Sequence, residues 1–211
     1  MQLYDYWRSS AAYRVRIALN LKGLAYEQLS VDLPTGAQRS DAFLAQNPQG
    51  LVPYLKDGAL GVGQSLAIIN YLNERYPEPP FLPADLGARA EIRALALLIV
   101  CEIHPLNNLR VLRHLEHDLG QDEAARLAWY HHWLETGFDA LETALSARGG
   151  TFCWDDAPGF ADVCLVPQVY NAERYQFDLT PYPAIRRINQ RCLELDAFDR
   201  ARPERQPDAP K

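Results

Sequence analysis

The chain has 211 residues, of which 48% are hydrophobic and 23% are charged, and its formal net charge at pH 7 is −6. This composition is typical of a folded protein with one large domain or two modest ones. A negative net charge without a cluster of Lys and Arg argues against a nucleic-acid partner. The longest apolar run, residues 94–101, is too short to span a bilayer, and the first residues lack a leader-like pattern. We therefore expect a cytoplasmic protein that does not act in a membrane.

The cysteines are widely spaced, at positions 101, 153, 164 and 192. They form no Cys-x-x-Cys pair and no Cys/His grouping with the spacing of metal ligands. Disulfide frameworks belong mainly to short secreted chains. The sequence thus predicts reduced, mostly buried thiols and no metal site.

The first 78 residues predict alternating strands and helices. The predicted strands are 2–6, 25–31, 52–55 and 59–62, and the predicted helices are 12–21, 40–45 and 65–76. Gly23 ends the first helix, and Lys56-Asp57-Gly58 is a hairpin signal between the last two strands. The order βαβαββα predicts a small sheet that carries helices, in a domain spanning residues 1–78.

Beyond this domain the sequence turns helical. Four prolines between positions 77 and 85 indicate a linker, which we place at residues 79–86. Ile92, Leu95, Ile99 and Ile103 keep a helical rhythm. Further helices are predicted at 124–147, 161–174 and 184–195, before a tail rich in Pro and Arg. The segment 87–211 is therefore predicted to form an all-helical domain.

Polar residues stand at the start of two predicted helices. Ser9-Ser10 would place hydroxyls and free backbone N–H groups at the positive end of a helix dipole, which favours an anion such as a thiolate. Gln64-Ser65 repeat the pattern and suit a carboxylate. Either serine could instead be an ordinary N-cap, with Ser65 the expected N-cap of its helix. The residue before a proline is held extended, so the backbone of Val52 could pair with an extended peptide ligand.

Together these features resemble the thioredoxin-like domain of the glutathione transferases. Residues 9–19, SSAAYRVRIAL, are similar to the zeta-class signature Ser-Ser-Cys-x-x-Arg-Val-Arg-Ile-Ala-Leu. Other similar blocks are 47–53 (NPQGLVP), 64–69 (QSLAII), 103–109 (IHPLNNL), 161–168 (ADVCLVPQ), 171–175 (NAERY), 178–183 (DLTPYP) and 205–208 (RQPD). The later blocks are typical of the maleylacetoacetate and maleylpyruvate isomerases of this class. The resemblance implies a thioredoxin-like domain followed by an all-helical transferase domain, hence an α/β plus all-α fold.

The resemblance also implies which residues bind glutathione. Ser9 would hydrogen-bond the glutathione sulfur, with Ser10 beside it. Val52, before a cis Pro53, would pair with the cysteinyl unit, and Gln64 and Ser65 would hold the γ-glutamyl end. The further candidates are Gln38, Gln49, His104 and Asn108. His104 and Asn108 are one helical turn apart, and Pro105 should bend their helix.

The implied reaction is the cis–trans isomerisation of maleylacetoacetate by thiolate addition, bond rotation and elimination. Arg8, Arg174 and Arg110 are the candidates for the substrate carboxylate and for the charge that develops on its oxygens. Maleylpyruvate shares the reacting unit and is the alternative substrate. A transferase that acts on α-halo acids and a noncatalytic glutathione-binding protein are further alternatives. The resemblance also implies a homodimer.

Two positions depart from the family pattern. Ala11 replaces the cysteine that follows the serine pair, which counts against redox chemistry with a protein thiol but not against isomerisation, since glutathione supplies the thiol. Gly159 replaces the Ser or Thr three residues before Asp162, so it cannot supply the side-chain half of a capping box.

Overall fold

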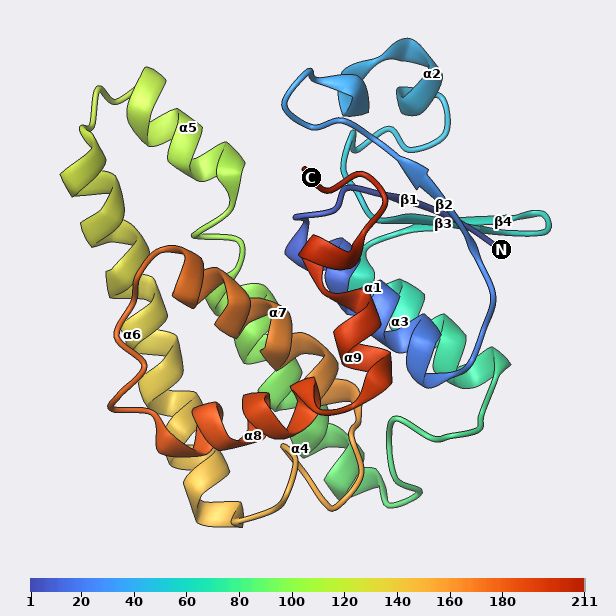
Figure 1. The fold of residues 1–211 in the computed structure, drawn as a ribbon, viewed down its shortest axis with the longest axis vertical. Helices are drawn as coiled ribbons and strands as arrows, with labels where there is room; N and C mark the ends of the chain where they lie inside the picture. The colour runs from blue at the N-terminus through green and yellow to red at the C-terminus, as the bar shows by residue number, and fades with distance from the viewer. Residues whose placement is uncertain (211) are drawn as a thin grey trace. The chain divides into compact units, whose positions relative to one another are not determined.

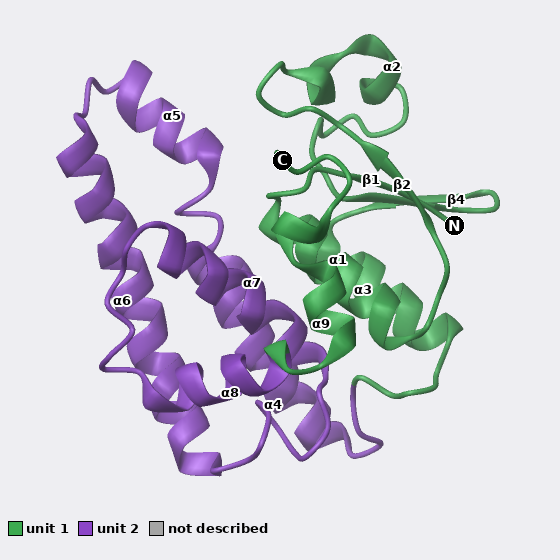
Figure 2. Cartoon of the chain, viewed as in Figure 1, with its two compact units in different colours: residues 1–81, 193–211 green, residues 82–192 purple. Residues whose placement is uncertain are grey.

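The computed structural model describes residues 1–210 and divides the chain into two compact units. Unit 1 comprises Met1–Phe81 together with the C-terminal segment from Leu193 onward, and unit 2 comprises Leu82–Cys192 (Figure 2). The sequence placed all of 87–211 in the helical domain. The structure instead groups the segment from Leu193 onward with the N-terminal sheet.

Unit 1 is built on a four-stranded sheet with the strand order β2-β1-β3-β4. Its elements are β1 (Gln2–Asp5), α1 (Ser10–Leu21), β2 (Glu27–Ser30), η1 (Ala37–Arg39), α2 (Asp41–Leu44), β3 (Tyr54–Asp57), β4 (Leu60–Gly63), α3 (Ser65–Arg75), α9 (Asp196–Ala201) and η3 (Pro203–Arg205). The predicted order βαβαββα is confirmed. The hairpin strands lie slightly later than predicted because Gly58, with φ +60°, is the first residue of the two-residue loop.

The strand directions bring several connections to one edge of the sheet. β1 pairs with β2 in parallel and with β3 antiparallel, and β3 pairs with β4 antiparallel. β1, β2 and β4 therefore all end at the edge where β3 begins. Tyr54, the first residue of β3, lies opposite Tyr4 on one side and Gly63 on the other. The segments that follow β1 and β4 and the segment that precedes β3 consequently meet there.

The two faces of the sheet are covered differently. Leu3 and Leu55 are fully buried on the face that carries α1 and α3, which lie side by side in Figure 1. The other face carries Tyr4 and Tyr54, which pack against a cluster of Val31, Phe43 and Val52 from the long connection between β2 and β3. This cluster anchors the connection at the edge where β3 begins.

The C-terminal segment packs beside α1. Phe198 and Ala201 of α9 are fully buried. The Asn20 side-chain amide donates to the Ala197 carbonyl over 2.9 Å, and Arg16 Nε donates to the Ala201 carbonyl over 3.0 Å. The prediction that this segment belongs to the helical domain missed these contacts, because they join residues that are far apart in the sequence.

Unit 2 is helical. Its elements are α4 (Leu86–Leu97), the π-helical turn η2 (Leu98–Ile103), α5 (Leu109–His117), α6 (Glu123–Arg148), α7 (Phe160–Arg174) and α8 (Pro183–Leu193). At the start of α7, the Asp162 carboxylate accepts hydrogen bonds from the backbone N–H groups of Cys153 and Gly159, over 2.8 and 2.9 Å. Asp162 thus makes its half of a capping box opposite a glycine. Across residues 1–210, no helix combines the length and the apolar character needed to cross a bilayer.

Candidate active site

Ser9 occupies the junction of β1 and α1. It is the N-cap of α1, and its Oγ accepts a hydrogen bond from Ala12 N–H over 3.2 Å. A serine hydroxyl can accept through its lone pairs and still donate its single proton. The N-cap contact therefore fixes the Ser9 oxygen and leaves its O–H as the donor for a second group. The structure confirms that Ser9 caps the helix, and its contact with an anion stays a prediction.

The start of α1 is electrostatically suited to an anion. The first turn of α1 contains no acidic side chain, so nothing on the helix itself offsets its positive end. Ser10 is buried and begins the helix, and Arg8 is exposed one residue before the cap, with its guanidinium carbon 5.2 Å from the centre of the Trp7 ring. A thiolate at this position would be stabilised by the helix end and by the Ser9 hydroxyl.

Val52 and Pro53 lie just before β3, at the same edge of the sheet. The Val52–Pro53 peptide bond is cis, as the resemblance implied. Both residues are buried, and Val52 packs with Phe43 in the cluster that covers the Tyr4 face. The Val52 backbone lies outside the strand pairing, which begins at Tyr54. The local structure thus permits the predicted pairing of this backbone with an extended ligand, which stays a prediction.

Gln64 and Ser65 begin α3 at this edge. The N-cap is Gln64, not Ser65 as predicted, and it makes no side-chain cap hydrogen bond. Gln64 has φ +67°, an uncommon conformation for a residue with a side chain, and such strain is concentrated at functional sites. Ser65 is the first helical residue, and its Oγ accepts from Arg14 Nη1 over 3.4 Å. With no acidic residue in its first turn, α3 offers a second positive helix end.

The two further glutamines lie on the connection before β3. Gln49 Oε1 accepts from Gln64 Nε2 over 2.9 Å, so these two candidates are in direct contact. Gln38 Oε1 is buried and has no hydrogen-bond partner within residues 1–210. A buried polar atom without a partner destabilises the fold, so it commonly marks a place where a ligand or a water molecule supplies the missing hydrogen bond. The residues of unit 1 thus fit a glutathione-like ligand, with a thiol near Ser9 and a carboxylate near Ser65.

Two of the protein thiols, Cys153 and Cys192, are poor competitors for this role. Burial raises the pKa of the Cys153 thiol well above its usual value, with the Asp162 carboxylate adding to the effect. Burial and the same carboxylate also raise the pKa of Cys192. Ala11 supplies no thiol at the start of α1. A reactive thiolate at the Ser9 position would therefore come from a bound ligand.

His104 and Asn108 lie in unit 2, and their local structure differs from the prediction. They do not share one bent helix, because η2 ends at Ile103 and α5 begins at Leu109. Pro105 has no N–H to continue the ladder, so the helix stops instead of bending. Asn108 is the N-cap of α5, accepting from Arg110 N–H over 3.2 Å. The turn still brings Asn108 Nδ2 within 3.4 Å of His104 Nε2, so the two side chains do meet.

The two arginine candidates of unit 2 are exposed. Arg110 lies in the first turn of α5. Arg174 is the last residue of α7, where its Nη1 donates to Asn171 Oδ1 over 3.2 Å and its guanidinium carbon lies 4.9 Å from the centre of the Tyr175 ring. These contacts hold the Arg174 guanidinium over an aromatic face, an arrangement that leaves some of its donors for a carboxylate.

Sequence reasoning missed the two buried arginines of α1. Arg14 contacts Ser65, and Arg16 pairs with Asp5, with both oxygens of that carboxylate 2.8 Å from Nη1. A signal was present, since both arginines lie within the otherwise apolar stretch YRVRIAL. Charged residues on a buried helix are rare unless they are paired, so the stretch was a signal from which buried partners for both could have been inferred.

Comparisons with known proteins agree with this geometry. The glutathione S-transferase N-terminal domain family matches residues 3–80. A maleylpyruvate isomerase from Ralstonia is 51% identical, with 99% of this chain and 100% of the relative covered. The chain belongs to the zeta-class glutathione transferases.

Solved structures of this class share the complete fold. The holo structure of a maleylpyruvate isomerase, described as a bacterial zeta-class glutathione transferase, has a TM-score of 0.97 and 51% identity, with both chains fully covered. The maleylacetoacetate isomerase of Methylobacterium extorquens, solved with bound malonate and glutathione, has a TM-score of 0.96 and 44% identity, again over both full chains. These zeta-class structures confirm the predicted fold class, a thioredoxin-like domain followed by a helical transferase domain.

Proposed function

We propose that this zeta-class chain is a glutathione-dependent cis–trans isomerase of maleylacetoacetate, with maleylpyruvate as the alternative substrate. The observation that carries the proposal is the convergence of Ser9, Val52, Gln64 and Ser65 at one edge of the sheet. Relatives and solved neighbours that are 44–51% identical bear the names of these two isomerases. The two substrates share the reacting unit, so one site serves either of them.

Glutathione, when bound, supplies the nucleophilic thiol that this chain itself lacks at position 11. The residues of unit 1 would hold it and lower the pKa of its thiol. Ser9 donates its O–H toward the sulfur, and the positive end of α1 favours the thiolate. The backbone of Val52 pairs with the cysteinyl unit, and Gln64 and Ser65 hold the γ-glutamyl end. Gln38 and Gln49 are further proposed glutathione contacts from unit 1. His104 and Asn108 are the proposed glutathione contacts from unit 2.

The substrate requires cationic partners. It is an anion, and the reaction pushes further negative charge onto its carbonyl oxygens. Arg8, Arg174 and Arg110 are proposed for this role because a guanidinium fork matches a carboxylate with two hydrogen bonds. Arg174 is the leading candidate because Asn171 and Tyr175 already orient its guanidinium.

The decisive test follows isomerisation and thiol concentration together. Each substrate is mixed with the protein and with glutathione at a small fraction of the substrate concentration. We expect full conversion to the trans isomer with no loss of glutathione thiol. Thiol loss that matches turnover would contradict the isomerase and favour the conjugating transferase. The ratio of kcat/KM for the two substrates identifies the physiological one.

The alternative activities predict different results in the same assay. A transferase acting on α-halo acids would release halide from such an acid and consume glutathione in equal amount. A noncatalytic glutathione-binding protein would retain glutathione affinity and convert neither substrate. The absence of a cysteine at position 11 disfavours chemistry that needs a protein thiol, but conjugation of glutathione does not need one.

We also propose a cytoplasmic homodimer. None of the four cysteines, which all lie within residues 1–210, forms a disulfide in the structure, an arrangement that fits a reducing compartment. The family implies the dimer, with residues 59–63 and the first long helix of the helical domain near the contact. Light scattering should give twice the chain mass of 23.9 kDa. A particle of one chain mass at micromolar concentration would contradict the dimer.

A further inference from the structure

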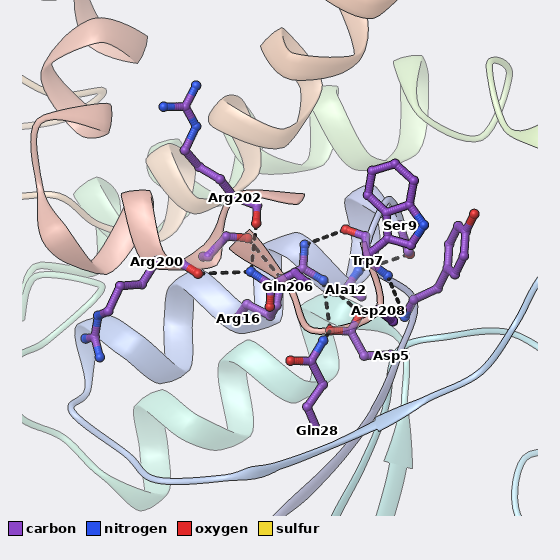
Figure 3. Close-up of polar contacts among 12 residues, drawn as sticks. Asp5, Trp7, Ser9, Ala12, Arg16, Gln28, Arg200, Arg202, Gln206 and Asp208 are labelled. Carbon is purple, nitrogen blue, oxygen red and sulfur yellow. Dashed lines mark hydrogen bonds and ion pairs between the residues drawn. The ribbon is translucent and has the colours of Figure 1, made fainter. Parts of the chain in front are cut away.

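The connection that leads from β1 into Ser9 is held by hydrogen bonds at successive peptide groups. Tyr6 N–H donates to Asp5 Oδ1 over 2.6 Å, and Ser9 N–H donates to the Tyr6 carbonyl over 2.9 Å. Between them, Trp7 N–H donates to Asp208 Oδ2 over 3.0 Å, and the Trp7 carbonyl accepts from Arg16 Nη2 over 2.9 Å (Figure 3). The backbone before Ser9 is therefore fixed from β1, from α1 and from the C-terminal segment.

Arg16 is the centre of this arrangement. Its side chain and that of Asp5 are fully buried, and Nη1 lies 2.8 Å from both carboxylate oxygens. The remaining groups of the guanidinium bind the Trp7 and Ala201 carbonyls. A buried guanidinium is stable only when its donors are matched in this way. Arg16 consequently ties the strand, the Ser9 connection and the C-terminal segment to one rigid group.

The C-terminal segment delivers Asp208 in a fixed geometry. After α9, the Gln206 side-chain amide donates to the Arg200 and Arg202 carbonyls over 2.9 and 2.7 Å (Figure 3). Backbone bonds from Gln206 to Pro203 and from Ala209 to Gln206, both 3.1 Å, continue the turn on either side. The turn is anchored at Ala201 by Arg16. Asp208 is thus presented to Trp7 by a folded segment and not by a loose strand.

The Asp208 carboxylate accepts one hydrogen bond within the described residues. Oδ2 binds Trp7 N–H, whereas Oδ1 is buried without a hydrogen-bond partner among residues 1–210. A buried carboxylate oxygen without a partner is costly for the fold. Stability of the fold alone therefore does not account for a carboxylate at this place.

We propose that Asp208 is a positioning residue for Ser9. It holds the Trp7 peptide two residues before the N-cap, so the Ser9 hydroxyl keeps the orientation in which it caps α1 and donates its proton to the thiolate. The C-terminal segment thereby becomes part of the thiolate site, although its carboxylate does not touch the ligand. This inference rests on the proposed function of Ser9 at the glutathione sulfur.

The test compares the thiol pKa of bound glutathione in full-length variants, measured by the ultraviolet absorbance of the thiolate. Asp208→Ala should raise this pKa by about one unit, which lowers kcat/KM at neutral pH about tenfold. The loss should disappear at alkaline pH, where the thiol is ionised in both proteins. A general folding defect would persist at every pH. Asp208→Asn keeps an acceptor for Trp7 N–H and should stay within about threefold of the parent.

A matched control is available in the same segment. Asp196→Ala removes another carboxylate, whose only described ion pair is with Arg200 at the surface, and should leave the thiol pKa unchanged. If Asp208→Ala does not fold, Asp208→Glu replaces it; the carboxylate is then displaced by one methylene, and we expect the same direction of shift. An unchanged thiol pKa in Asp208→Ala or in its replacement, or equal losses for the Ala and Asn variants, overturns the proposal.

Ser9→Ala separates this inference from the function on which it rests. If Ser9→Ala raises the thiol pKa but Asp208→Ala does not, only the positioning role fails. If neither variant changes the thiol pKa, the role of Ser9 at the sulfur fails, and the positioning role fails with it. Substrate turnover is measured separately, so loss of isomerase activity alone does not enter this comparison.

Discussion

At the scale of single residues, one hydroxyl serves both the fold and the candidate site. Ser9 Oγ accepts the N–H of Ala12, which satisfies a backbone donor that α1 would otherwise leave free. The same contact orients the remaining O–H. A side chain whose rotamer is fixed in this way loses little entropy when it donates to a ligand. This small loss of entropy explains why a residue whose sequence position predicts a simple N-cap is also the best candidate for the thiolate contact.

Replacing Ser9 by Ala should raise the thiol pKa of bound glutathione by about one to two units, since a hydrogen bond to a charged group contributes about 1.5–3 kcal/mol. The rate at neutral pH should fall tenfold or more. Thiolate absorbance against pH measures the shift. Ser40→Ala is the matched control, because Ser40 is also an N-cap, accepting from Phe43 N–H over 3.3 Å. If Ser10→Ala shifts the pKa and Ser9→Ala does not, the assignment within the pair is wrong.

Arg174 should contribute to substrate binding and not to glutathione binding. Arg174→Met keeps much of the aliphatic stem and removes the charge, so KM for the free acid should rise about tenfold or more while glutathione affinity stays unchanged. KM for a neutral ester of the substrate should rise less than KM for the free acid does. Steady-state kinetics on both compounds measure the difference, with the exposed Arg186→Met as control. Equal losses for acid and ester would falsify the carboxylate role.

At the scale of elements, η2 and α6 approach each other unusually closely in unit 2. A Cβ at Gly137 of α6 would collide with Cδ1 and Cγ1 of Ile103, the last residue of η2. Ile103 directly precedes His104, so this contact lies next to the point where η2 ends and the turn to Asn108 begins. The glycine is therefore explained by packing, not by backbone conformation.

Gly137→Ala should lower the free energy of unfolding by about 1–3 kcal/mol, because overpacking outweighs the helix propensity gained. Ile103→Ala removes both colliding atoms and should cost about 2–5 kcal/mol alone. The double variant should lose clearly less free energy of unfolding than the sum of the two single losses, since the cavity left by Ile103→Ala accepts the new methyl group. Denaturant unfolding of the three variants measures the coupling. Strictly additive losses would show that the two residues do not share this contact.

At the scale of the whole molecule, the ligand should stabilise the fold through unit 1. Glutathione at 100 times its Kd should add about 2.7 kcal/mol to the free energy of unfolding. Ser65→Ala should weaken binding about tenfold through loss of a hydrogen bond to a charged group, so a smaller rise in Tm is expected at the same concentration. Thermal unfolding with and without glutathione checks this. Ser146→Ala on α6 is the control, and an undiminished rise in Ser65→Ala would exclude Ser65 from the site.

The sequence alone determined the order of elements and most of the candidate site residues. Alternation and helical periodicity are local signals, so they located the sheet elements and long helices such as α6 within a few residues. The serine pair, Val52-Pro53 and Gln64-Ser65 were found because each is a short motif at the end of an element. Their meeting at one edge follows from strand direction, which the sequence order only implied.

Only the tertiary structure decided what depends on distant contacts. It assigned the segment from Leu193 onward to unit 1, where α9 packs on α1, and it brought Asp208 to Trp7 across 201 residues of chain. It also showed that the helical structure is interrupted between His104 and Asn108, and that Gln64 and not Ser65 is the N-cap of α3. Local propensity cannot foresee the placement of α9 and of Asp208, because hydrogen bonds and packing between parts of the chain that no sequence window contains together fix it.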